Sequence, residues 1–250
     1  MDKADYETAL HALHHSLRVA QIAMFRQKRR AIVVLEGFDA AGKGGVIREL
    51  SYAWDPRGFE VFPIGPPTER EQHQPFLWRF WQKLPEPGQI AVFDRSWYGR
   101  LLVERVEGGL SQTMFERSAA RILDFEAQLL EEGFDLIKVF MRIDQATQRQ
   151  RLRRRAEVPE KRWKLTESDL DALALHGAYE QAVADMIRVC DRPVWHVVDC
   201  NDKRSGRLAV LKAIHGMLIE KASERTFSFN PGVEARLSEL QDPDYLHHEG

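Results

Sequence analysis

Hydrophobic and polar positions follow two different periods along the chain, and the pattern predicts strands separated by helices. Short apolar runs predict strands at 31–35, 59–64, 90–94, 136–143 and 194–198. Apolar residues recur at helical spacing between them, most clearly in segments 4–28 and 112–132. Another helix is expected to begin near Glu69 and to place Phe76, Leu77, Phe80, Trp81 and Leu84 in the core. This alternation predicts an α/β fold in which helices flank a five-stranded parallel sheet with right-handed crossovers.

The clearest local motif joins the first predicted strand to a helix that includes Val46. Four residues separate Gly37 from Gly42, and Lys43 follows, which gives the pattern G-x-x-x-x-G-K. Between a strand and a helix, such a loop offers backbone N–H groups and a lysine to phosphate oxygens. We therefore expect a phosphate-loop (Walker A) site for a polyphosphorylated ligand, formed by Gly37, Ala40, Ala41, Gly42, Lys43, Gly44 and Gly45.

The loop departs from the usual pattern at Gly44, where Ser or Thr would bind Mg²⁺, and it carries a carboxylate at Asp39. Two negative charges about 6 Å apart repel each other by roughly 3 kcal/mol at an effective dielectric constant of about 20. A bare Asp39 would therefore weaken phosphate binding, whereas a cation between the two groups would strengthen it. We interpret Asp39 as a Mg²⁺ ligand. The alternative, Asp39 as a base for a hydroxyl acceptor, would indicate a nucleoside or small-alcohol kinase.

A second carboxylate, Asp94, ends the apolar run at 90–94. In phosphate-loop proteins, an aspartate at the end of a strand beside the loop strand (Walker B) faces the metal ion. Ligands of parallel sheets bind at the carboxyl ends of the strands, where both Asp94 and the loop are expected to lie. The sequence thus predicts a metal site at Asp39 and Asp94.

Positive charge is concentrated between the last two predicted strands, where Val158 and Pro159 predict a break between two helical pieces. In nucleotide-kinase topologies this crossover is a lid that closes arginines over the transferring phosphates. A solvated helix face or a nucleic-acid patch are the alternatives. The expected lid covers about 149–170 and carries Arg151, Arg154, Arg155, Lys161, Arg162 and Lys164.

The composition of the chain limits the classes of protein to which it can belong. The chain has 250 residues, a formal net charge of -2 and 30% charged residues, which is ordinary for a soluble globular protein. Together with the alternation of strands and helices and the phosphate-loop motif, this predicts one phosphate-loop kinase domain over 1–225 and an appendage over 226–250. The net charge predicts no general attraction to nucleic acid or membrane. The sequence shows neither an apolar run of about 18 residues nor an export signal, so we expect a cytoplasmic protein with buried thiols at Cys190 and Cys200.

Four ordered motifs resemble polyphosphate kinase family 2 from about residue 10 to about residue 220. The motifs are residues 37–45, 93–98, 161–165 and 201–204. The resemblance implies a phosphate-loop kinase with a lid, which moves a terminal phosphoryl group reversibly between inorganic polyphosphate and a nucleotide. It also implies that Asp39 and Asp94 hold Mg²⁺, with Mn²⁺ as an alternative, and that Lys43 and Arg95 contact transferring phosphates.

The segments 78–81, 94–100 and 103–108 resemble most the polyphosphate:AMP phosphotransferase branch of that family. This implies phosphorylation of AMP to ADP first, and of ADP to ATP as a second reaction. Two positions depart from the family pattern, because Val158 precedes Pro159 where Asp is frequent and His176 stands where an aromatic residue occurs. Both departures bear on nucleotide specificity.

A chain with a net charge of -2 must bind a linear polyanion through a local groove. We expect that groove to use Arg70, Arg79, Lys203, Arg204 and Arg207. The partners would be polyphosphate and a purine nucleotide, together with further copies of the chain as a dimer or tetramer. Two other functions stay open at this point: an ATP-dependent nucleotide kinase, and a non-catalytic module that binds a polyanion or nucleic acid.

Overall fold

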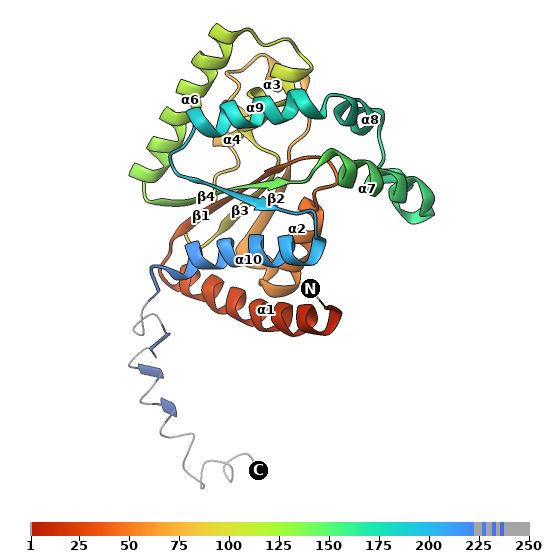
Figure 1. The fold of residues 1–250 in the computed structure, drawn as a ribbon. Helices are drawn as coiled ribbons and strands as arrows, with labels where there is room; N and C mark the ends of the chain where they lie inside the picture. Colours follow the sequence, from red (N-terminus) through yellow and green to blue (C-terminus); the bar gives the residue numbers. More distant parts are fainter. Residues whose placement is uncertain (1, 223–226, 229–231, 234–235, 238–250) are drawn as a thin grey trace.

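A single sheet organises the computed structural model, which describes residues 2–222, 227–228, 232–233 and 236–237 (Figure 1). Within these residues the sheet has five strands in the order β2-β3-β1-β4-β5. Every pairing is parallel, as the sequence predicted. The strands are β1 (Arg30–Gly37), β2 (Phe59–Pro63), β3 (Ile90–Asp94), β4 (Phe134–Arg142) and β5 (Trp195–Asp199).

Helices cover both faces of the sheet (Figure 1). On one face α1 (Lys3–Arg26), α2 (Lys43–Ala53) and α10 (Lys203–Ile219) pack against one another. On the other face lie α6 (Gln112–Glu131) and α9 (His176–Val189). The remaining pieces are α3 (Glu69–Gln72), α4 (Trp78–Trp81), α5 (Val103–Val106), α7 (Gln145–Glu157), α8 (Glu167–Ala174), η1 (Pro56–Gly58), η2 (Trp97–Arg100) and η3 (Pro159–Lys164).

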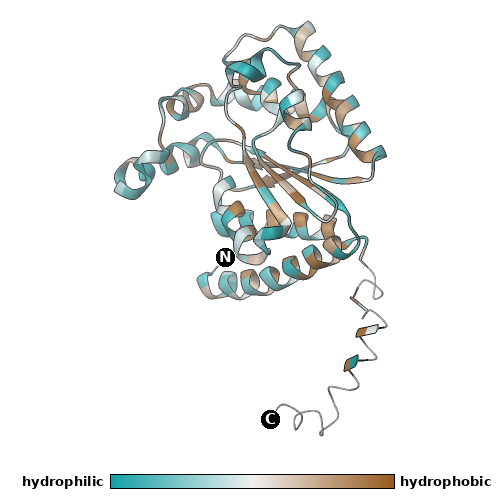
Figure 2. Cartoon of the chain, turned by 180° about the vertical axis from the view of Figure 1, so that it is seen from behind, coloured by the Kyte–Doolittle hydropathy of each residue, from teal (hydrophilic) through white to brown (hydrophobic). Residues whose placement is uncertain are grey.

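The central strands form the core because both of their faces are covered. All five residues 31–35 of β1 are fully buried, as expected for a parallel strand between two helical layers. Figure 2 shows the apolar strands between helices whose outer faces are hydrophilic. The edge strand β2 is only partly buried, and its final residue Pro63 fits an edge position because proline donates no ladder hydrogen bond.

The segment 69–84 differs from its prediction. Instead of one helix it forms two four-residue helices, α3 and α4. Pro75 lies between them, and a proline inside a helix removes a hydrogen bond and clashes with the preceding turn. The core position of Phe80 is confirmed, whereas Trp81 is 43% exposed and packs edge-on against Phe125.

Three further predictions concern the periphery and the thiols. Cys190 and Cys200 are free and buried, as predicted, and burial raises the pKa of their thiols to about 12 and about 11. Among the described residues, each helix is too short or too polar to cross a bilayer. Most of the appendage predicted at 226–250 lies outside the described residues, so that prediction and the domain boundary stay predictions.

Candidate functional site

The loop after β1 turns tightly before α2 begins at Lys43. Its backbone takes positive φ angles of 149° at Gly37, 64° at Ala40 and 120° at Gly42. A side chain at Gly37 would place its Cβ 2.4 Å from the carbonyl oxygen of Met141 on β4. Glycine is therefore required where the loop strand approaches its neighbour, which fixes the start of the loop.

Lys43 is the first residue of α2 and follows the loop directly. Its Nζ donates hydrogen bonds to the carbonyl oxygens of Gly37 at 2.7 Å and Phe38 at 3.4 Å. The ammonium is thus held beside the helix N-terminus, where backbone N–H groups and the helix dipole also favour an anion. A phosphate-binding role for Lys43 stays a prediction.

Asp39 contacts the other predicted phosphate ligand directly. A terminal guanidinium nitrogen of Arg95 donates to Asp39 Oδ1 at 2.6 Å. Asp39 is 18% exposed and Arg95 is 46% exposed. The negative charge of Asp39, which would otherwise repel a bound phosphate, is therefore balanced by a cation. In this structure that cation is the Arg95 guanidinium.

Asp94 lies one strand away from the loop strand, because β3 pairs with β1 and places Asp94 beside Leu35. Its half-buried carboxylate accepts no hydrogen bond from the described residues, although its charge acts on Arg95. A half-buried carboxylate without a protein donor fits a Mg²⁺ ligand. No group of three metal-binding side chains occurs in the described part of the chain, which still suits an ion that takes one or two carboxylates plus phosphate oxygens and water.

Sequence reasoning missed Glu36, the residue before Gly37. Its side chain is buried and accepts a hydrogen bond from Ser96 Oγ at 2.8 Å. Burial raises the pKa of Glu36, while the Ser96 hydrogen bond and the charges of Lys43 and Arg95 act in the opposite direction. A carboxylate at the end of an apolar strand was the available signal.

A pocket opens beside the loop and extends toward α5, α8 and α9. Asp39 and Arg95 line this pocket, as do Tyr179 and Glu107, and the Tyr179 hydroxyl donates a hydrogen bond of 2.5 Å to Glu107. Phe38 stacks on His176, with 4.4 Å between ring centroids. The lining residues are Glu36, Gly37, Phe38, Asp39, Arg95, Gly99, Leu102, Val103, Glu107, Phe140, Gln148, Ser168, Ala172, Tyr179 and Val183.

Cations gather around Lys203 at the start of α10. Partial burial and then the charges of four neighbours lower the pKa of the Lys203 ammonium. In decreasing order of effect these neighbours are Arg151, Arg154, Lys161 and Arg155. We call Lys203 and these four residues the cation cluster. Several cations close to one another are typical of a site for a strong anion, because the anion offsets their mutual repulsion.

Arg151 differs from the other residues of the predicted lid. It is buried, and its guanidinium donates to the carbonyl oxygens of Ala40, Ala41, Cys200 and Asn201 at 2.6 to 3.1 Å. In this structure Arg151 therefore ties α7 to the phosphate loop and to the loop before α10. Burial lowers the pKa of Arg151, with nearby acidic groups opposing the shift.

The remaining lid residues are held less tightly. The predicted break is confirmed, because α7 ends at Glu157 and η3 begins at Pro159. Arg155 contacts Asp169 at 3.4 Å, and Arg162 donates to the carbonyl oxygen of Ala156 at 2.8 Å. Lys161, Arg162 and Lys164 are exposed, as is Arg154 on the last turn of α7.

The residues predicted for the polyphosphate groove lie in different environments. Arg79 is 13% exposed and pairs with Glu71 at 3.3 Å, and Arg207 donates to Tyr6 at 2.6 Å and pairs with the buried Glu49. Arg70 is exposed and lies over Trp78. Arg204 lies near the ring of Tyr6. Within this set, the structure brings Lys203 into the cation cluster.

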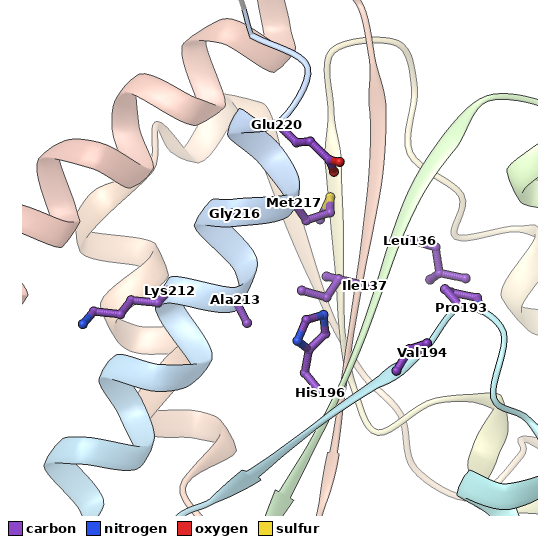
Figure 3. Close-up of a pocket in the computed structure, with 10 residues that line it drawn as sticks. All are labelled: Leu136, Ile137, Pro193, Val194, His196, Lys212, Ala213, Gly216, Met217 and Glu220. Carbon is purple, nitrogen blue, oxygen red and sulfur yellow. The ribbon is translucent and has the colours of Figure 1, made fainter.

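A second cavity, of about 420 Å³, lies between α10 and the strands β4 and β5 (Figure 3). Its lining includes Ile137, Val194, His196 and Met217. In Figure 3 the amine of Lys212 points away from the other lining residues. This cavity adjoins the amino-terminal halves of β4 and β5, whereas the phosphate loop follows the carboxyl end of β1.

Curated relatives of the chain share one chemistry in their names. A polyphosphate:AMP phosphotransferase from Pseudomonas syringae pv. tomato is 44% identical over 228 residues, which make up 90% of this chain and 45% of that protein. An AMP/ADP-polyphosphate phosphotransferase from Meiothermus ruber is 35% identical over 196 residues, or 77% of this chain and 73% of that protein. The chain spans less than half the length of the first of these relatives.

Solved structures of other proteins have the same fold as this chain. The crystal structure of polyphosphate kinase 2 from Arthrobacter aurescens TC1 superimposes with a TM-score of 0.88 at 31% identity, covering 96% of this chain and 88% of that chain. A putative polyphosphate kinase 2 from Pseudomonas aeruginosa gives 0.84 at 40% identity, covering 88% and 48%. The family profile of polyphosphate kinase 2 matches residues 1–226. With the phosphate loop and the parallel sheet in place, the chain belongs to the polyphosphate kinase 2 family.

Proposed function

We propose that the chain transfers the terminal phosphoryl group of inorganic polyphosphate to a nucleotide, with AMP as the first acceptor and ADP as the second. The observation that carries the proposal is the positive charge at the phosphate loop, where Lys43 and Arg95 lie and where Arg151 joins the loop to the residues before Lys203. A donor with many phosphates needs more positive charge than the loop lysine supplies. The names of the relatives from Pseudomonas and Meiothermus support the same donor and acceptors.

On the donor side, Lys43 and the loop N–H groups would bind the terminal phosphates, and Lys203 with Arg154 and Lys161 would bind the chain behind them. Arg79 and Arg207 already pair with carboxylates of this chain. We therefore assign them weaker contacts with polyphosphate than Lys203. Arg70 and Arg204 are proposed to extend the groove.

Asp39 and Asp94 would hold Mg²⁺ or Mn²⁺, which neutralises negative charge on phosphate oxygens when bound. Arg95 contacts only Oδ1 of Asp39, and for both carboxylate oxygens to be open to the ion Arg95 must leave. The released guanidinium would then meet the transferring phosphoryl group. The Asp39–Arg95 ion pair is thus the resting arrangement of two groups that act separately on the substrate.

On the acceptor side, the pocket lined by Arg95 would bind the nucleotide, with Phe38, Leu102 and Val103 as apolar contacts for its base. A phosphate oxygen of AMP is already ionised at neutral pH, so its attack requires alignment and charge neutralisation but no strong base. Closure of η3 and the end of α7 would bring Arg154 and Arg155 over the phosphates and exclude water.

The donor is tested by giving the protein AMP and Mg²⁺ with either polyphosphate or ATP and separating the products by chromatography. We expect ADP to form with polyphosphate as the sole phosphoryl donor. Formation of ADP with ATP alone would instead support an ATP-dependent nucleotide kinase. Polyphosphate binding without any product in either mixture would support the non-catalytic module.

The affinity for long polyphosphate is expected to fall steeply between about 50 mM and 200 mM salt, because binding releases counterions from a polyanion. Lys203→Ala should reduce the slope of log affinity against log salt by about one. Lys212→Ala is the matched control, since Lys212 is an exposed lysine of the same helix outside the cation cluster. A titration by calorimetry that gave one slope for all three proteins would contradict the groove.

A further inference from the structure

Arg95 has a backbone conformation that needs support. Its φ angle is 64°, in the left-handed region that non-glycine residues seldom adopt. The Arg95 N–H donates to the carbonyl oxygen of Leu35 at 3.0 Å, which holds one side of the residue. Such conformations persist only where the surrounding structure holds them, and they concentrate at functional sites. The residues that follow Arg95 supply the support on its other side.

Three consecutive side chains after Arg95 are anchored in the core. Ser96 Oγ donates to Glu36 at 2.8 Å. Trp97 Nε1 donates to Glu126 Oε1 at 3.0 Å, and the Tyr98 hydroxyl donates to the same oxygen at 2.7 Å. Ser96, Trp97 and Tyr98 are all buried. Glu126, on α6, thus accepts two of the three anchoring hydrogen bonds.

Lys138 completes this arrangement from β4. Its Nζ donates to Glu126 Oε2 at 2.9 Å, to the Tyr98 hydroxyl at 2.9 Å and to the carbonyl oxygen of Cys190 at 3.0 Å. All three ammonium donors are satisfied, and the side chains of Lys138 and Glu126 are both 0% exposed. Burial raises the pKa of Glu126, and the charge and hydrogen bond of Lys138 oppose that shift most strongly.

A fully buried ion pair is weak support for stability alone, because apolar residues of similar volume are frequently as stabilising. The Glu126–Lys138 pair contacts Trp97 and Tyr98, two and three residues after the strained Arg95, which indicates a role in geometry. We propose that Glu126 and Lys138 are positioning residues that fix Trp97 and Tyr98 and thereby hold the backbone of Arg95, so that its guanidinium meets Asp39 in this structure and the phosphates in the substrate complex. This inference rests on the proposed function for the role of Arg95 toward substrate.

The test compares Glu126→Gln and Tyr98→Phe with a buried ionic control on the same strand as Lys138. Asp135 pairs with Arg29 at 2.7 Å and Lys221 at 2.6 Å near the start of β4, far along the strand from the site. We expect both test variants to lower kcat by about tenfold or more, with KM for AMP within about threefold. Asp135→Asn should lower the melting temperature while kcat stays within about twofold.

A double-mutant cycle separates positioning from general damage. If Glu126 acts through Arg95, Glu126→Gln should lower kcat further by less than about twofold once Arg95 is alanine. An equal loss in both backgrounds would overturn the proposal. So would a kcat loss in Asp135→Asn as large as that in Glu126→Gln at the same melting temperature.

A crystal structure of Glu126→Gln gives a readout that does not depend on activity. We expect the φ angle of Arg95 to leave the left-handed region or the Asp39–Arg95 contact to open. Retention of both would overturn the positioning role even if the variant were inactive. Conversely, an inactive parent protein whose Glu126→Gln variant loses the Arg95 geometry would contradict the proposed function and support the positioning role.

Discussion

Replacing Asp94 with asparagine is expected to lower kcat by about 100-fold or more at saturating polyphosphate and AMP. The amide keeps the size of the side chain but removes the negative charge that we assign to a divalent cation. Because the Asp94 carboxylate accepts no hydrogen bond from the described residues, the fold should lose little stability. Initial rates across a Mg²⁺ titration, together with Mn²⁺ binding measured by electron paramagnetic resonance, would report both effects.

Asp199→Asn is the matched control for this experiment. Asp199 also ends a parallel strand, but on β5, and its side chain accepts a hydrogen bond from the Asn201 N–H at 2.8 Å. Asparagine can keep that bond, so kcat should stay within about threefold. Turnover of Asp94→Asn within threefold of the parent at saturating Mg²⁺, with unchanged Mn²⁺ binding, would exclude Asp94 as a metal ligand.

Replacing Arg154 and Arg155 together with alanine is expected to lower kcat by about 1,000-fold, the size of effect attributed to arginines that stabilise phosphoryl transfer. Both residues belong to the last turn of α7, next to the break at Val158 and Pro159. They would reach the transferring phosphoryl group only after closure, so the Kd for AMP should change by less than about threefold. Single-turnover rates and calorimetric AMP binding measure the two quantities separately.

Arg153→Ala controls for the general loss of charge on α7. Arg153 is exposed on the same helix but is not among the cations that lower the pKa of Lys203. Its kcat should stay within about twofold of the parent. If the Arg154 and Arg155 variant instead weakened AMP binding by the whole loss in kcat/KM, these arginines would bind the ground state and would not act in closure.

The strands and the loop were predictable because they depend on local patterns. Apolar runs mark strands buried on both faces, and the spacing from Gly37 to Lys43 marks the turn into α2. The break of the helix predicted at 69–84 was also readable, since Pro75 stands in its middle. The prediction gave the apolar stripe more weight than the proline. The two helices that form instead have only four residues each, so they do not depend on a stripe of apolar residues.

The partners of charged side chains were not predictable, because they come from elements distant in sequence. Arg151 appears in the sequence as one basic residue among many, yet it binds carbonyl oxygens on two loops. Arg207 pairs with Glu49 across 158 positions of the sequence. Lys138 is an exception, because a lysine within an otherwise apolar strand requires a buried acceptor, and this need is visible in the sequence.

The proximity of the two aspartates follows from strand order. Asp94 lies beside the loop only because β3 is a neighbour of β1 in the sheet. The general pattern of phosphate-loop proteins implied that these two strands are neighbours, whereas the hydrophobic pattern alone does not specify it. The sequence predicted that Asp94 ends a strand beside the loop strand, and the pairing of β1 with β3 confirms this. It did not reveal that Arg95 is the ion-pair partner of Asp39 in this structure.

The central claim is that a divalent cation joins Asp39 and Asp94 to the polyphosphate donor. The most direct test is a crystal of the unmodified chain soaked with polyphosphate and Mn²⁺, with the ion located by anomalous scattering. We predict an Mn²⁺ peak coordinated by carboxylate oxygens of Asp39 and Asp94 and by a phosphate oxygen, with Arg95 moved away from Asp39. Bound polyphosphate with no ion on either aspartate would contradict the account.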